Sequence, residues 1–125
     1  MNTLYDALFA QHTLNDAAFL ETDDGVTVSF AAFVKRAAQM AHVLRDAGVG
    51  PGDRVLVQTP KTVDMLALYA GCVQAGSAFL PLNTAYTLAE VSYFVGDAAP
   101  AMIVCDVIDA AAIAASVADK DIAVL

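Results

Sequence analysis

The spacing of apolar and polar positions changes along the chain and separates an N-terminal region from a longer second region. In the second region, short apolar stretches alternate with stretches in which apolar residues recur every three or four positions. The short stretches are typical of buried strands, and the longer spacing is typical of helices. The predicted strands are residues 55–58, 78–80, 102–105 and 122–125, and the predicted helices are residues 60–75, 87–97 and 106–118.

Strands that alternate with helices predict parallel βαβ units, whose crossovers are right-handed. Thr59 and Pro60 are expected to open the first of these helices, because proline fits the first helical position. Thr87 and Glu90 have the spacing of a capping box, so they are expected to cap the second helix. Val63, Leu66, Ala67, Ala70 and Val73 form the predicted buried stripe of the first helix.

The N-terminal region has a different pattern. Residues 3–11 predict a short helix, and residues 19–28 predict a β-hairpin whose turn is Asp23-Asp24-Gly25. Aspartate and glycine suit such a turn, since they supply local hydrogen bonds and a positive φ. Ser29 is expected to cap an amphipathic helix over residues 30–47.

The predicted fold class is therefore α/β. Residues 1–47 are expected to form helix, hairpin and helix, and residues 48–125 a βαβαβαβ unit with a mainly parallel sheet. A parallel sheet needs cover on both faces. The predicted pattern ends on a strand without a closing helix, so we expect residues 1–125 to be a single α/β segment at the N-terminal end of a larger domain.

Composition narrows the expected partners. Apolar residues make up 58% of the chain and charged residues 16%, whereas typical domains have more charge. The excess predicts a surface covered by the remainder of its own chain or by self-association as a dimer or larger. The formal net charge is −8, which excludes nucleic acid and anionic membranes as expected partners.

The expected cellular location and the expected state of the cysteines rest on sequence features that are missing. The first residues lack the basic and apolar regions of a signal peptide, and no apolar run reaches the 18–20 residues of a membrane span. The cytoplasm is therefore the expected location. Cys72 and Cys105 lie far apart without a CxxC pattern, so we expect two buried thiols and no zinc site.

Several motifs carry candidate chemistry but have simpler interpretations. Residues 48–52, Gly-Val-Gly-Pro-Gly, are rich in glycine, but they join a helix to a strand, whereas a phosphate loop joins a strand to a helix. We interpret them as a turn. His12 and His42 have no metal-ligating or acid–base neighbours in the sequence. No catalytic, cofactor-binding or metal-binding residue is predicted in this segment.

An acidic cluster would be the basis of one alternative function. Asp23, Asp24 and Asp106 resemble the acidic residues of a phosphorylatable receiver domain, and Asp106 follows an apolar strand. Asp23 and Asp24, however, lie in a predicted hairpin turn, and Lys120 precedes the last strand rather than following it. A degenerate receiver-like regulatory domain stays open as an alternative, as does a free-standing α/β binding or interaction module.

Two blocks resemble the adenylate-forming superfamily, which includes acyl-CoA synthetases, luciferases and peptide-synthetase adenylation domains. Residues 28–33 (VSFAAF) are similar to its early strand-to-helix block, although Phe30, Ala32 and Phe33 stand where Tyr, Glu and Leu are usual. Residues 74–83 (QAGSAFLPLN) are similar to its helix-Gly-strand-Pro-Leu-Asn block. The continuation through residues 81–90 looks most like the malonyl-CoA synthetase branch. The resemblance covers nearly the whole chain.

The resemblance implies a two-step reaction for a complete enzyme. A carboxylate attacks ATP to give an acyl-adenylate and pyrophosphate, and the CoA thiol then displaces AMP. In the family the phosphate loop, its lysine, the acidic magnesium ligand and the adenosine pocket follow the part matched here. The resemblance therefore implies ATP, Mg and CoA for the complete enzyme, none of them bound by residues 1–125 alone, which we expect to be inactive.

Overall fold

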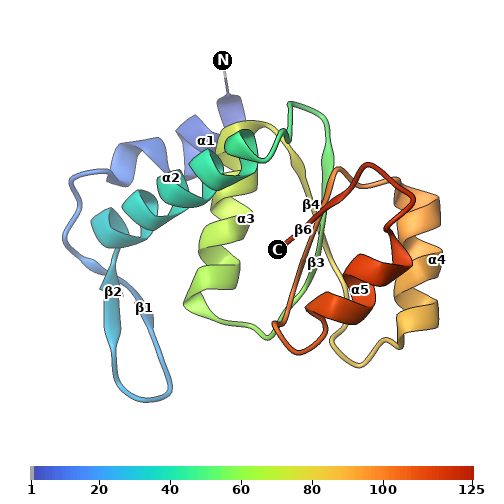
Figure 1. Cartoon of the computed structure of the whole chain (residues 1–125). Coiled ribbons are helices and arrows are strands. Elements are labelled where there is room, and N and C mark those ends of the chain that lie inside the picture. Colours follow the sequence, from blue (N-terminus) through green and yellow to red (C-terminus); the bar gives the residue numbers. More distant parts are fainter. Residues whose placement is uncertain (1) are drawn as a thin grey trace.

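The computed structural model describes residues 2–125, and helices and a hairpin make up its first part (Figure 1). In chain order the elements are α1 (Thr3–Leu8), the short 3-10 helix η1 (Ala10–His12), β1 (Ala18–Glu21), β2 (Thr27–Ser29) and α2 (Phe30–Asp46). Strands β1 and β2 pair antiparallel as a separate two-stranded sheet. The predicted hairpin is confirmed, and the predicted helix over residues 3–11 is interrupted at Phe9.

Local chemistry explains the two ends of α2. The Ser29 hydroxyl accepts a hydrogen bond from the Ala32 N–H at 3.1 Å, as predicted for its N-cap. Gly48 follows the helix with a φ of +89°, a conformation that glycine adopts without a steric penalty. Phe33, Ala37 and Leu44 are buried on one face of α2, which confirms the predicted amphipathic helix.

The second part is a four-stranded parallel sheet with helices on both faces. Its elements are β3 (Arg54–Gln58), α3 (Val63–Ala75), β4 (Ala78–Pro81), α4 (Leu88–Ala98), β5 (Met102–Cys105), α5 (Ala110–Ser116) and β6 (Ala123–Val124). The strand order is β4-β3-β5-β6, and every neighbouring pair is parallel. The predicted α/β fold with a parallel sheet is therefore confirmed.

The three layers of this part are visible in Figure 1, where α2 and α3 lie on one side of the sheet and α4 and α5 on the other. Successive residues of the central strand β3 serve opposite faces. Val55 and Val57 belong to the core beneath α2 and α3, whereas Leu56 belongs to the core beneath α4 and α5. A strand buried on both faces needs apolar residues at every position, which explains why residues 55–57 form an unbroken apolar run.

The predicted start of α3 is wrong. The helix begins at Val63, and the N-cap is Thr62, whose hydroxyl accepts a hydrogen bond from the Met65 N–H at 3.2 Å. Thr59 and Pro60 instead lie in the loop after β3. The predicted buried stripe is also wrong at Leu66, which is 45% exposed, because the helix turns Leu68 and Cys72 toward the sheet.

Three smaller differences concern the ends of elements. Pro81 is the last residue of β4 rather than a residue beyond it, which an edge strand allows because one side of it needs no N–H donor. Helix α5 and strand β6 are shorter than the predicted ranges 106–118 and 122–125. Within residues 2–125, no helix is long and apolar enough to cross a membrane.

The N-terminus of α4 carries the predicted cap in a modified form. The Thr87 hydroxyl accepts a hydrogen bond from the Glu90 N–H at 3.2 Å and donates one to the Glu90 carboxylate, also at 3.2 Å. The Glu90 carboxylate thus meets the hydroxyl of Thr87, whereas a full capping box would place it on the backbone N–H of that residue.

Replacing Thr87 with alanine should therefore destabilise the chain. The change leaves the Glu90 N–H without its side-chain acceptor, and the expected loss is about 1 kcal/mol of unfolding free energy. Urea midpoints of the two proteins measure it, with Thr87→Ser as the control because serine keeps the hydroxyl. An unchanged midpoint for Thr87→Ala would mean that this cap contributes nothing.

Candidate functional site at the carboxyl ends of the strands

The connections after β3 and β5 leave the sheet in opposite directions. From β3 the chain passes through α3 to β4 on one side, and from β5 it passes through α5 to β6 on the other side. In open α/β sheets, such a reversal of strand order opens a crevice at the carboxyl ends of the strands, where ligands bind. The candidate site therefore lies where Gln58 and Cys105, the last residues of these neighbouring strands, are paired in register.

Gln58 shapes the floor of this crevice. Its side chain is only 7% exposed, the one buried polar residue of the described core. The amide Nε2 donates hydrogen bonds to the carbonyl oxygens of Asn83 and Tyr86, both at 3.1 Å. A buried amide with two partners fixes the backbone that it holds, so Gln58 sets the path of the loop that joins β4 to α4.

Two cavities flank the held loop. The larger one, of about 570 Å³, lies between the loops that follow β3 and β4 and is lined by Thr59, Pro60, Lys61, Met65, Pro81, Leu82, Asn83 and Thr84. The smaller one, of about 100 Å³, lies toward α4 and α5 and includes Gln58, Thr84 and Asp109. The larger volume falls within the usual range for small-molecule sites.

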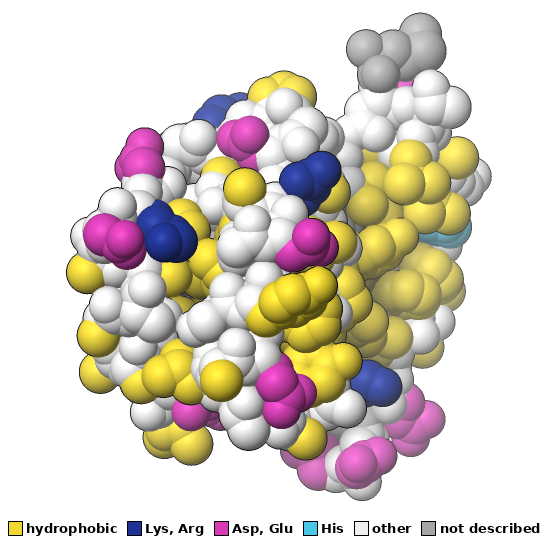
Figure 2. Space-filling view, turned by 90° about the vertical axis from the view of Figure 1, so that its right-hand side faces the viewer, with side chains coloured by type: hydrophobic (Ala, Val, Ile, Leu, Met, Phe, Trp, Pro, Cys, Tyr) yellow, Lys and Arg dark blue, Asp and Glu magenta, His cyan; other side chains and the backbone are white. Residues whose placement is uncertain are grey.

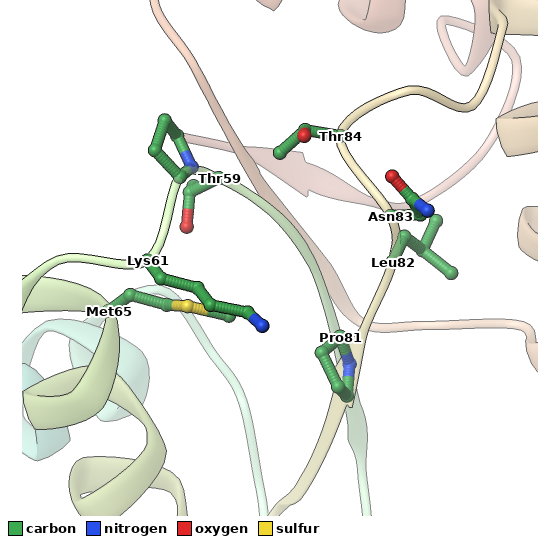
Figure 3. A pocket seen from close by; sticks show the side chains of 8 residues that line it. Thr59, Lys61, Met65, Pro81, Leu82, Asn83 and Thr84 are labelled. Carbon is green, nitrogen blue, oxygen red and sulfur yellow. The ribbon is translucent and has the colours of Figure 1, made fainter.

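The larger cavity contains a cation and several neutral polar groups. Figure 3 shows the Lys61 side chain extending from the loop after β3 into the space in front of Pro81, with Asn83 and Thr84 on the opposite loop. The Thr59 hydroxyl oxygen is buried and has no hydrogen-bond partner in the described part of the chain. The Asn83 carboxamide oxygen accepts from the Ala85 N–H at 2.9 Å, which leaves its NH₂ group for other partners.

The loop after β5 is acidic and partly apolar. The Asp106 carboxylate accepts a hydrogen bond from the Ile108 N–H at 3.2 Å, and Val107 and Ile108 are 85% and 84% exposed. Burial, together with the nearby carboxylates of Asp109 and Asp106, raises the pKa of the Cys105 thiol. A raised thiol pKa lowers the thiolate fraction at neutral pH, so Cys105 is poorly suited to act as a nucleophile.

Most motifs considered from the sequence lie outside this crevice. Asp23 and Asp24 lie at the tip of the separate hairpin sheet, so the structure does not join them to Asp106 in a receiver-like cluster. His12 stacks on Phe30 with ring centroids 4.4 Å apart, and His42 interacts with Arg45 on the same helix. Both histidines thus have packing or surface contacts.

The glycine-rich stretch at residues 48–52 forms the predicted turn between α2 and β3. Gly52 has a φ of +81° and donates its N–H to the Gly76 carbonyl at 2.9 Å. The Gly50 N–H donates to the Asp53 carboxylate at 2.8 Å. This turn precedes β3, whereas the crevice follows it, so the two features lie at opposite ends of the strand.

Gln58, Thr59 and Lys61 were not predicted as site residues from the sequence. Assigning Thr59 and Pro60 to a helix start hid the four-residue loop that follows β3. The available signal was positional: polar residues directly after a buried parallel strand lie at the edge where ligands bind. No group of three or more side chains that could hold a metal ion occurs in the range 2–125.

Comparison with known proteins identifies the family. The model of the family described as AMP-binding enzyme matches residues 7–124. The chain belongs to the AMP-binding enzyme family. This membership confirms the predicted resemblance to adenylate-forming acyl-CoA synthetases, because the match spans both regions of the chain. The matched residues include the hairpin, α2 and the parallel sheet.

Individual members of the AMP-binding family agree with this assignment. The apo crystal structure of MatB from Rhodopseudomonas palustris superposes with a TM-score of 0.93 and 43% sequence identity over 99% of this chain. A feruloyl-CoA synthase of an Amycolatopsis species is 34% identical over 80 residues, which is 64% of this chain and 16% of that protein. CymA of Salinispora arenicola, a probable non-canonical nonribosomal peptide synthetase, is 36% identical over 90 residues, which is 72% of this chain and 1% of that protein.

The chain is much shorter than these family members. It spans 25% of the MatB chain and smaller shares of the other two proteins. The matched part of MatB includes the hairpin, α2 and all four strands described above, because it covers 99% of this chain. The chain therefore matches one part of these longer proteins.

Proposed function

We propose that residues 1–125 form the opening segment of an ATP-dependent acyl-CoA ligase that acts on malonate or a small related carboxylate. The complete enzyme would convert the carboxylate, ATP and CoA to acyl-CoA, AMP and pyrophosphate through an acyl-adenylate. The observation that carries the proposal is the match to MatB, with 43% identity and a TM-score of 0.93 over 99% of the chain.

The geometry of the segment favours a structural role in that reaction, in which the segment holds loops in position. Gln58 holds the loop at Asn83 and Tyr86, and the doubly buried strand β3 holds Gln58. The carboxyl end of β3 is thereby joined to the loop after β4, at the edge of an α/β sheet on which ligand sites are built. No step of the chemistry is assigned to a side chain of this segment.

In the proposed enzyme, the residues that bind magnesium would lie outside this segment. The metal would neutralise the phosphate charge of ATP, but the described residues offer no cluster of ligands that fits it. The same holds for the expected phosphate loop, which the resemblance places after the matched part. ATP, Mg and CoA therefore remain proposed requirements of the complete protein.

The proposed partner of the segment is the remainder of its own enzyme, in the cytoplasm. Figure 2 shows the face formed by α4 and α5, where hydrophobic side chains are spread among polar ones. Leu88, Tyr93, Val107 and Ile108 are exposed large hydrophobic residues of this part. Without a covering partner, we expect the isolated chain to self-associate through such surfaces.

The proposed function is tested by product formation in the complete protein. Malonate, ATP and CoA should yield malonyl-CoA, AMP and pyrophosphate in equal amounts, measured by mass spectrometry and a pyrophosphate assay. Residues 1–125 alone should remain at background in the same assay and serve as the negative control. ADP and phosphate as products, or no product with any small carboxylate, would contradict the proposal.

A further inference from the structure

We propose that the cavity between the loops after β3 and β4 binds an anionic group, a carboxylate or a phosphate, through Lys61. The inference rests on the proposed function only for the choice of probes, since the substrates of that reaction are anions. All lining residues of the cavity belong to the segment, so its binding can be measured on the 125-residue chain at concentrations where light scattering shows a monomer.

The position and size of the cavity favour a ligand. It lies at the carboxyl ends of two neighbouring parallel strands, and its volume is about 570 Å³. Pro81 and Met65 give it apolar walls, while the polar groups come from both loops (Figure 3). A small ligand could therefore be held by polar contacts and still lose part of its hydration.

The charge of the cavity favours an anion. Lys61 has no carboxylate within 4 Å in the described structure, whose ion pairs are Arg36–Asp64 and Lys120–Asp119. Lys61 is the basic side chain among the residues that line this cavity, and no carboxylate is among those residues. Its ammonium carries three donors and can contact an oxyanion without moving the backbone.

Neutral donors would complete the recognition of an oxyanion. The buried Thr59 hydroxyl lacks a partner, and a buried polar group without a hydrogen bond is destabilising. The unused NH₂ group of Asn83 and the Thr84 hydroxyl lie on the facing loop. One cation with several neutral donors is a donor set that suits a carboxylate or phosphate.

Nearby acidic groups set a limit on the affinity. Lys61 also borders a second cavity of about 630 Å³, which is lined by Glu21, Asp23 and Asp24 of the hairpin. These carboxylates attract the lysine and repel an anion, although none of them lies within 4 Å of the Lys61 ammonium, the distance of an ion pair. We therefore expect millimolar binding, strongest at low ionic strength, where charges are least screened.

The test is an NMR titration of the 125-residue chain with malonate, pyrophosphate and acetate at low salt. Amide signals of Thr59, Lys61, Asn83 and Thr84 should shift with one common Kd for malonate, pyrophosphate or both. Lys61→Gln should weaken that binding roughly tenfold, because a charge-assisted contact is lost. Lys61→Arg should retain it, and Lys35→Gln on α2, which lines none of these cavities, should leave it unchanged.

Each outcome is informative. Binding of malonate alone identifies a carboxylate site, and binding of pyrophosphate alone identifies a phosphate site. Equal binding by the parent chain and Lys61→Gln, or no saturable shift below about 10 mM, overturns the inference. Loss of binding in Lys61→Gln together with failure of the complete protein to make malonyl-CoA would keep the site and remove the proposed function.

Discussion

A complete ligase of the proposed kind is expected to use malonate at least about 100-fold better than acetate, in terms of kcat/KM. A dicarboxylate leaves a second carboxylate in the acyl pocket after the first one is adenylated. A pocket that accepts this charge has to hold a cation, and arginine fits best because its planar fork grips a carboxylate through two hydrogen bonds. Acetate would leave that cation buried and without a partner.

The size of the effect follows from this mismatch. Removing one partner of a buried ion pair costs about 3–5 kcal/mol, and each 1.36 kcal/mol changes a rate ratio about tenfold. The expectation rests on the likeness of the chain to MatB and on the resemblance of residues 81–90 to the malonyl-CoA synthetase branch. Values of kcat/KM for malonate, methylmalonate, acetate and benzoate measure it. A monocarboxylate as the best substrate would keep the family and remove malonate from the proposal.

Replacing Gly71 with alanine is expected to destabilise the chain by about 1–2 kcal/mol, although alanine is the better helix former. Gly71 lies on α3 where that helix packs against α2. A Cβ atom there would lie 2.8 Å from the Cβ of Met40 and 3.0 Å from the Ala37 carbonyl oxygen and the Ala41 nitrogen. Two of these three atoms are backbone, so α2 itself has to move.

Opposing contributions set the magnitude. Overpacking costs about 1–3 kcal/mol, and the higher helix propensity of alanine returns up to about 1 kcal/mol. Gly96→Ala on α4 is the matched control, because a Cβ atom at Gly96 would meet nothing within 4 Å. That control should gain about 0.5–1 kcal/mol, since only the backbone entropy changes.

Urea unfolding of the parent chain and both glycine variants decides this prediction. The two variants carry the same chemical change in helices of the same chain, so their difference isolates the contact between α2 and α3. Gly71→Ala should shift the midpoint down and Gly96→Ala should shift it up. Equal shifts would show that α2 and α3 do not pack as closely as the structure places them.

The order of elements was predictable because each carries its own local signal. The unbroken apolar run at residues 55–57 follows from burial on both faces, and Ser29 predicts its helix start by local hydrogen bonding. Thr87 could likewise be identified from its spacing to Glu90, although the contact between the two side chains differs in detail. Signals of this kind need no knowledge of distant residues.

The candidate site was not predictable, because distant contacts decide it. Pro60 fits a helix start by its type, but α3 begins after Thr62, whose hydroxyl accepts a hydrogen bond from the Met65 N–H. Gln58 looks like any polar residue at a strand end until its amide is seen between the carbonyls of Asn83 and Tyr86, 25 and 28 residues away. Lys61 becomes a candidate binding residue only when the structure shows the cavity that the loops after β3 and β4 form together.

The most direct test of the central proposal measures the activity of a chimera. In this chimera, residues 1–125 of this chain replace the matching first quarter of R. palustris MatB. A segment that folds and positions its strands as MatB does should give a chimera with malonate-dependent ATP–pyrophosphate exchange within about tenfold of MatB, a change of about 1.4 kcal/mol in the barrier. The same chimera with Gly71→Ala should be less stable. A folded chimera without malonate-dependent exchange would contradict the account.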